Sequence, residues 1–247
     1  MGELIGLLFY MVLSLPLVRT LALTLVPALA LLAYVRKKDW LEPEPPKLVW
    51  GLFGLGVLSV IPAFFLELGA LYVLSLLLDS ESLVFRLIQW FLVVGLAEEG
   101  CKYAMLYKKT WMHPAFNCTF DAVVYAVAVS AGFALAENIT YLINYGSSAM
   151  LIRALVSVPA HICFAVLMGS WYGSAKRLNT WEQPEKSRSA RRLALLVPVL
   201  AHGLYDLIVS GVNSGEAVAL FIIFVAVMFL VCFLRVRKLS NTDEYIA

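Results

Sequence analysis

Several ionisable side chains lie well inside long apolar stretches of this chain, where a bilayer would make their burial costly. Carboxylates, imidazoles and one ammonium group make up this set: Glu98, Glu99, Lys102, Glu137, His161, His202 and Asp206. Carboxylates and imidazoles activate water, either as general bases or as ligands of a divalent metal. The residue types therefore indicate water-activating or proton-transfer chemistry inside a membrane.

Helical spacing places some of these side chains beside one another. Glu98 and Lys102 are four residues apart, as are His202 and Asp206, so each pair shares a helix face. Glu98 and Glu99 point about 100° apart on a helix and should have different roles. We favour Glu99 as the base, because Glu98 can pair with Lys102.

Each feature also has a structural interpretation when it is taken singly. A Glu–Lys pair in a membrane helix can be an internal ion pair, and a histidine can be an interhelical hydrogen-bonding group. Asn138 is expected to pack or to form hydrogen bonds beside Glu137. Glu67, a weaker member of the set, is expected to serve helix packing or to have a role near a loop.

Depth favours a shared site over these separate interpretations. At ~1.5 Å per residue, Glu99, His161 and His202 each lie roughly 14–15 Å from the nearer edge of their spans. Glu137 is expected to lie somewhat closer to the outer edge. Four consecutive spans therefore bring carboxylates and imidazoles near one plane in the middle of the membrane.

The composition requires membrane helices to position these groups. The 247 residues are 62% hydrophobic and 15% charged, with a mean hydropathy of +0.84. A soluble chain is roughly 45–50% apolar and about 25% charged. This excludes a soluble enzyme, a nucleic-acid-binding protein and a disordered protein. We expect one integral membrane domain over 1–247, an all-α polytopic transmembrane helical bundle.

Hydropathy predicts seven spans, with the catalytic core over about 83–212. They cover 3–35, 49–77, 83–107, 121–144, 151–175, 193–212 and 216–235. Pro16 and Arg19 interrupt the first, which would make eight spans if that run is two pieces. The proline-rich segment 42–46 cannot be helical throughout.

Lys and Arg residues alternate between successive connections. They occur after the first, third and fifth spans and in the tail, whereas 78–82, 145–150 and 213–215 contain none. The positive-inside rule then predicts a multi-pass cell-membrane protein with its N-terminus outside and its C-terminus in the cytoplasm.

Five short motifs in order resemble the PrsW family of intramembrane proteases. They are Glu98-Glu99-x-x-Lys102, Asp121-x-x-x-Tyr125, Phe133-x-x-x-Glu137-Asn138, His161 with Gly169 eight residues later, and His202-x-x-x-Asp206. The segment Glu42-Pro-Glu-Pro45, with Asp39 before it, is also similar to that family. The wider CAAX-protease superfamily has a histidine where this chain has Glu137, and an arginine where it has Lys102.

The resemblance implies endoproteolysis of a membrane protein, for example a single-span anti-sigma factor cut at its extracytoplasmic side. Glu98 or Glu99 would activate water, with Lys102 and Asn138 in support. The other four, Glu137, His161, His202 and Asp206, would bind a divalent metal, expected to be Zn²⁺, or stabilise the oxyanion. A metal-free scheme, in which glutamate alone activates the water, stays open.

Two other classes of protein fit the same residues. A proton- or cation-coupled transporter could use the buried groups as a relay, although the two halves of the chain show no internal repeat. A non-catalytic membrane scaffold of the same superfamily would have little reason to bear the cost of burying them. The lipid bilayer is the expected surrounding, no nucleic acid is expected as a partner, and the oligomeric state is left open.

Overall fold

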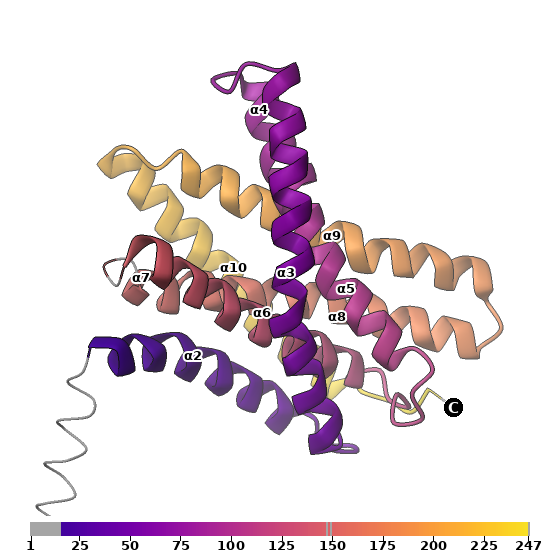
Figure 1. Ribbon diagram of the computed structural model, residues 1–247. Coiled ribbons are helices and arrows are strands. Elements are labelled where there is room, and N and C mark those ends of the chain that lie inside the picture. Colours follow the sequence, from indigo (N-terminus) through magenta and orange to yellow (C-terminus); the bar gives the residue numbers. More distant parts are fainter. Residues whose placement is uncertain (1–15, 147, 149, 247) are drawn as a thin grey trace, which may run out of the picture.

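Helices form the regular structure in the computed structural model, which describes residues 16–146, 148 and 150–246 (Figure 1). In chain order they are α2 (Pro16–Lys38), α3 (Pro46–Leu77), α4 (Leu83–Ile88), the π-helix η1 (Gln89–Gly95), α5 (Leu96–Thr110), α6 (Asp121–Tyr145), α7 (Met150–Leu155), α8 (Ser157–Thr180), α9 (Pro184–Ser210) and α10 (Gly215–Asn241). Within these residues the one β contact is an isolated bridge between Cys118 and Tyr245. The predicted all-α class is confirmed.

Five helical runs in the described residues are long and apolar enough to cross a membrane. They are α3, α6, the α7–α8 run Met150–Thr180, α9 and α10. The expected first span, 3–35, includes residues 1–15, which lie outside the described part of the chain. The prediction that this span is one piece or two therefore also falls outside the described residues. The protein is a multi-pass membrane protein, and the exact number of seven or eight spans stays a prediction.

The expected span 83–107 is built from three consecutive helical segments. A π-helix, η1, lies between α4 and α5. None of the three segments alone is long enough to cross a bilayer, which takes about 20 residues. π-helical insertions often accompany functional sites, and this one directly precedes the pair Glu98 and Glu99.

Helix α6 is the most enclosed element of the bundle. Every residue from Asp121 to Ala134 is buried. This segment consists mostly of alanine and valine, and helices α2, α3, α5 and α8 pack around it. Small side chains let neighbouring helices approach closely. Helices in lipid associate through such close packing, because burying apolar side chains in lipid does not itself favour association.

Two glycines let the backbones of α3 and α6 approach closely. A Cβ atom on Gly56 of α3 would lie 1.9 Å from the carbonyl oxygen of Val129, and one on Gly132 of α6 would lie 2.0 Å from that of Phe53. Real Cβ atoms never come so close to an oxygen. The two glycines therefore set the distance between α3 and α6.

The basic segments predicted to share one side of the membrane lie at one end of the bundle. Trp40, in the non-helical connection between α2 and α3, donates to the carbonyl of Ser240 at 3.0 Å. Lys176 donates to the carbonyl of Trp111 at 2.7 Å, and Arg177 pairs with Glu244. These contacts join the connection after α2 to the end of α10, and the end of α8 to both the connection after α5 and the C-terminal segment.

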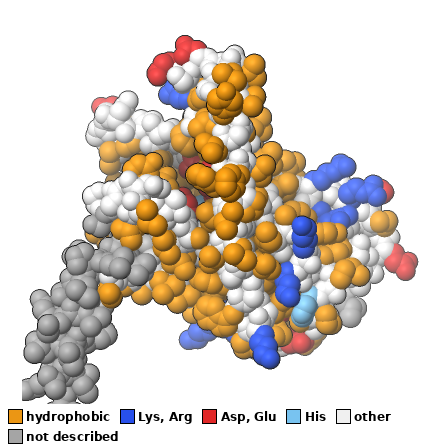
Figure 2. Space-filling view, in the orientation of Figure 1, with side chains coloured by type: hydrophobic (Ala, Val, Ile, Leu, Met, Phe, Trp, Pro, Cys, Tyr) orange, Lys and Arg blue, Asp and Glu red, His pale blue; other side chains and the backbone are white. Residues whose placement is uncertain are grey.

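The second half of α3 and α4 form an arm that extends from the bundle (Figure 1). Large apolar side chains on this arm are exposed, among them Phe64, Phe65, Leu68, Tyr72 and Leu76. Figure 2 shows acidic side chains in a recess beside the arm, surrounded by apolar surface. The exposed apolar side chains suit contact with lipid, whereas the recess contains carboxylates.

Substituting alanine for Gly132 should destabilise the protein, because the added Cβ would overlap the Phe53 carbonyl. We expect a loss of about 2–3 kcal/mol in the free energy of unfolding, as for other overpacked cores. Gly54→Ala, on the partner helix α3, is the matched control, since no atom lies within 4 Å of the Cβ position at Gly54. The control should be neutral or stabilise by about 0.5–1 kcal/mol. Unfolding in detergent measures both, and equal stability of the two variants would contradict the close α3–α6 contact.

Candidate active site

A cavity of about 520 Å³ opens beside the α3 arm and reaches the polar centre of the bundle. Its wall is formed by α3, η1, α5, α6, α7, α8 and α9. Six of its lining residues are carboxylates or imidazoles: Glu67, Glu98, Glu137, His161, His202 and Asp206. Except for Glu67, which was expected to serve packing, these are residues predicted from the sequence to form the site.

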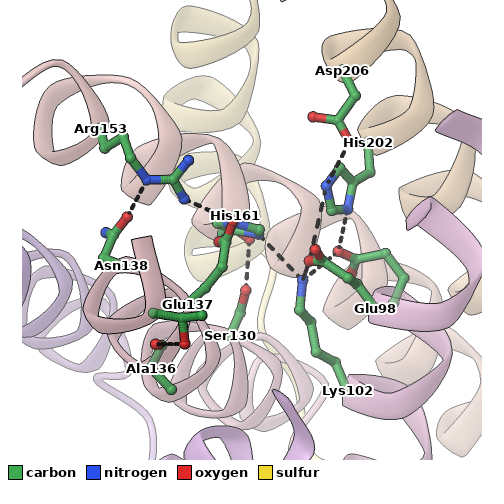
Figure 3. Close-up of polar contacts among 12 residues, drawn as sticks. Glu98, Lys102, Ser130, Ala136, Glu137, Asn138, Arg153, His161, His202 and Asp206 are labelled. Atoms are coloured by element: carbon green, nitrogen blue, oxygen red, sulfur yellow. Dashed lines mark hydrogen bonds and ion pairs between the residues drawn. The ribbon is translucent and has the colours of Figure 1, made fainter. Parts of the chain in front are cut away.

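Lys102 lies at the centre of the polar group. Its Nζ is 2.7 Å from Glu99 Oε1, 3.1 Å from Glu98 Oε2 and 3.2 Å from His161 Nδ1 (Figure 3). The ring of Phe133 covers the ammonium group, with Nζ 3.9 Å from the ring centroid. Lys102 therefore forms ion pairs with two adjacent carboxylates in a position that is closed to water.

His161 connects Lys102 to a second ion pair. Because an ammonium group can only donate, His161 Nδ1 must accept from Lys102, and the proton is then on Nε2. That Nε2 lies 2.7 Å from Glu137 Oε2. Arg153 in turn donates to Glu137 Oε1 at 2.7 Å and to Asn138 Oδ1 at 2.6 Å. Arg153 therefore fixes the positions of the Glu137 and Asn138 side chains.

His202 connects α9 to the same centre. Its Nδ1 lies 3.0 Å from Glu99 Oε1, and its Nε2 lies 3.3 Å from Asp206 Oδ2 and 3.9 Å from Glu98 Oε2. Both ring nitrogens face carboxylates, which suits a ring with a proton on each nitrogen. Phe164 stacks on the ring with centroids 4.8 Å apart, which fixes its plane.

The two adjacent glutamates differ in their access to the cavity. Glu98 lines the cavity, whereas Glu99 does not and is fully buried. Lys102 contacts both, so its pairing with Glu98 does not distinguish them as the sequence argument assumed. Of the two carboxylates, that of Glu98 is the one that meets the space a substrate or water would occupy.

A divalent metal fits part of this arrangement. Glu98, Glu99, His161 and His202 each offer a ligand atom, all within 4.8 Å of one another, and Glu99 Oε2 is buried without a hydrogen-bond partner. Nitrogen and carboxylate oxygen ligands suit Zn²⁺. Lys102 contacts three of the four groups, so a metal here would have to displace its ammonium group.

The predicted metal ligands are divided between two positions. His161 and His202 belong to the group of four that can converge on an ion. Glu137 and Asp206 instead contact the Nε2 atoms of these imidazoles. Carboxylates in such positions orient histidine ligands and strengthen them as donors.

Sequence reasoning missed Arg153 altogether. It lies in α7, near the start of the expected span 151–175, and its guanidinium stacks on Tyr141 at 3.6 Å from the ring centroid. A charged residue inside an expected span is a signal that could have identified it. Its partners could not be read from the sequence, because they depend on how α7 folds back over α6.

A helical membrane protein with a buried carboxylate–imidazole centre beside a polar cavity belongs to the class that performs polar chemistry within the bilayer. Residues 44–233 match the PrsW family of intramembrane metalloproteases. The chain is 32% identical to protease PrsW of Oceanobacillus iheyensis, covering 89% of this chain and 94% of that one. It is 35% identical to protease PrsW of Geobacillus kaustophilus, covering 89% and 90%, and 35% identical to that of Bacillus subtilis, covering 77% and 82%.

The chain therefore belongs to the PrsW family, and it is an intramembrane protease. No solved structure matches it. The family resemblance inferred from the five motifs is confirmed.

Arg153→Gln should destabilise the protein by leaving Glu137 without its cation. Breaking a buried ion pair costs about 3–5 kcal/mol, and we expect roughly 2–3 kcal/mol because both side chains retain some exposure. Adding Glu137→Gln should recover part of the loss, since the double variant has no unpaired carboxylate. Unfolding measurements on the parent, both single variants and the double variant give the coupling energy. Strictly additive losses would contradict the pair.

Proposed function

We propose that the protein is an intramembrane endopeptidase in which Glu98 activates the attacking water, with the catalytic core over about 83–212. The observation that carries this proposal is the shared cavity: the Glu98 carboxylate and the imidazoles of His161 and His202 all line it. A base must be within reach of its water and substrate. Glu98 has that access and Glu99 does not.

In the proposed reaction, the Glu98 carboxylate takes a proton from water as the water oxygen bonds to the scissile carbonyl carbon. Negative charge then develops on the carbonyl oxygen. A ring with protons on both nitrogens, as the contacts of His202 suit, can donate to that oxygen. The proton held by Glu98 passes to the amide nitrogen as the C–N bond breaks, which leaves a carboxylic acid and an amine.

The remaining polar residues position these groups. Lys102 and Glu99 hold the base and His202 from the closed side of the site, with contacts of 2.7–3.1 Å. Glu137 and Asp206 orient the two imidazoles, while Arg153 and Asn138 hold Glu137. Every residue predicted from the sequence thus has a role, although Glu99 becomes a positioning residue.

We further propose that Glu98, Glu99, His161 and His202 hold a divalent metal, with Zn²⁺ as the expected ion, as the alternative to the metal-free arrangement above. With the ion bound, His202 would give up a ring proton to become a ligand, Lys102 would be displaced, and the ion would replace His202 in stabilising the charge on the carbonyl oxygen. Such an ion would lower the pKa of bound water and polarise the scissile carbonyl. The charge balance supports it: five carboxylates (Glu67, Glu98, Glu99, Glu137 and Asp206) surround two fixed cations (Lys102 and Arg153). With all five ionised, the centre retains surplus negative charge that a divalent cation would offset.

The proposed substrate is a single-span membrane protein such as an anti-sigma factor, which reaches the cavity from the bilayer. The apolar arm beside the cavity supports entry of a transmembrane segment from lipid. The proposed location is the cell membrane, with the N-terminus outside and the C-terminus in the cytoplasm. The transporter and the scaffold are disfavoured, because the relatives compared are proteases.

Glu98→Gln should lower the rate of substrate cleavage by about 10²–10⁴-fold, the usual effect of losing a general base. His161→Ala and His202→Ala should abolish cleavage while the protein stays in the membrane. Glu99→Gln should lower the rate less than Glu98→Gln does, because Glu99 has no access to the cavity. Glu216→Gln, an exposed carboxylate at the start of α10, is the control.

Cleavage of a single-span reporter in reconstituted vesicles measures these rates. Parent-like cleavage by Glu98→Gln would show that the base is misassigned. Proton uptake into vesicles without any cleavage of candidate substrates would favour the transporter.

Zinc content tests the metal directly. Protein purified in detergent should contain about one Zn²⁺ per chain, and the His161→Ala/His202→Ala double variant should contain none, because two of the four converging donors are gone. Elemental analysis of both proteins gives the answer. Absence of zinc and other divalent metals from an active parent would favour activation of water by glutamate alone.

A further inference from the structure

A second group of buried carboxylates lies at the end of the bundle where the α2–α3 connection meets the C-terminal segment. Asp39, Glu44 and Asp121 each offer an oxygen, and these atoms lie within 4.8 Å of one another. Their exposed fractions are 4%, 4% and 0%. We call these three residues the acidic cluster. None of them lines the catalytic cavity.

Fixed hydrogen bonds hold the acidic cluster in place. Tyr125 donates to Glu44 Oε2 at 2.5 Å, and the backbone N–H of Glu44 donates to Asp39 Oδ2 at 3.3 Å. The backbone N–H groups of Asn117 and Cys118 donate to Asp121 Oδ2 at 3.0 and 2.7 Å. Each carboxylate therefore has one oxygen anchored by the protein.

Other oxygens of the acidic cluster have no partner. Asp39 Oδ1 and Asp121 Oδ1 are buried without a hydrogen bond, and so are the neighbouring oxygens Asn117 Oδ1 and Asp243 Oδ2. Within the described residues, no Lys, Arg or His comes within ion-pair distance of the three carboxylates. Three buried carboxylates without a cation would be strongly destabilising, so protons or a bound cation must neutralise them.

We propose that the acidic cluster is a binding site for a hard divalent cation of the Mg²⁺, Mn²⁺ or Ca²⁺ class. The donors available are all oxygens, from three carboxylates and the Asn117 amide, which suits these ions better than Zn²⁺. Asp39 Oδ1 and Asp121 Oδ1, which have no hydrogen-bond partner, are the oxygens free to bind the ion, and Glu44 would add a third carboxylate oxygen. The site is independent of the catalytic centre, whose donors include nitrogen.

A cation here would join separate parts of the chain. Asp39 follows α2, Glu44 precedes α3, and Asp121 begins α6. Asp243 of the C-terminal segment adjoins the group, since its Oδ1 accepts from the backbone N–H of Phe120 at 2.8 Å. The ion would therefore hold the connections at this end of the bundle together.

Protons are the competing occupants of the acidic cluster. Burial raises the pKa of Asp39 to about 6 and that of Glu44 to about 7, because desolvation disfavours the charged carboxylate. Protons therefore compete with a cation for these oxygens, and cation binding should strengthen as the pH is raised.

The experiment uses the full chain in detergent with His161→Ala and His202→Ala, which removes the imidazole donors of the catalytic centre. After chelator treatment at pH 8, Mn²⁺ binding is followed by electron paramagnetic resonance, and thermal unfolding is measured with Mg²⁺, Mn²⁺ or Ca²⁺. We expect one Mn²⁺ per chain bound at the acidic cluster. At least one of the three ions should raise the unfolding temperature by several degrees.

Asp121→Asn and Asp39→Asn, each added to this protein, should weaken Mn²⁺ binding by at least tenfold. Without cation, both should be no less stable than the parent, because each removes a buried unpaired charge. Glu216→Gln, the exposed carboxylate at the start of α10, is the control and should change the affinity less than threefold.

Failure of all three cations to bind or stabilise at pH 8 would overturn the proposal. Binding and stabilisation that persist unchanged in both aspartate variants would overturn it as well. Either result is independent of whether the protein cleaves a substrate, since the catalytic histidines are absent throughout.

Discussion

The contact between Lys102 and two adjacent glutamates is the interaction on which the rest of the site depends. Glu98 and Glu99 would repel each other in an apolar bundle, and the ammonium group between them makes their burial tolerable. Lys102 is only 1% exposed, so water contributes almost nothing to its solvation. The surrounding helices must therefore supply its hydrogen bonds, and His161 of α8 provides the third.

This requirement explains why directional contacts link so many helices. From Asn138 through Arg153, Glu137, His161, Lys102, Glu99 and His202 to Asp206, each residue lies within 3.3 Å of the next. Apolar packing in lipid is non-directional and would tolerate rotation of a helix. The series of polar contacts does not tolerate such a rotation. The glycine contact between α3 and α6 also fixes the position of α6, the helix that carries Glu137.

The residue types and their spacing were sufficient to predict the all-α class, the polar centre and the family. These depend on local properties: hydropathy over twenty residues, and helix faces at four-residue intervals. Other features depend on tertiary geometry. Which of Glu98 and Glu99 faces the cavity follows from the rotation of α5 after the π-helix η1. The role of Arg153 follows from how α7 lies against α6. The convergence of Asp39, Glu44 and Asp121 follows from contacts between connections that are distant in sequence.

The bridge between Cys118 and Tyr245 has a consequence for the order of events during biosynthesis. The segment that holds the 111–120 connection in place is translated after every helix of the bundle. The residues of the proteolytic centre, from Glu98 to Asp206, leave the ribosome well before it. The centre can therefore assemble while the opposite end of the protein is still open, and closure of that end by the segment around Tyr245 follows the synthesis of the centre.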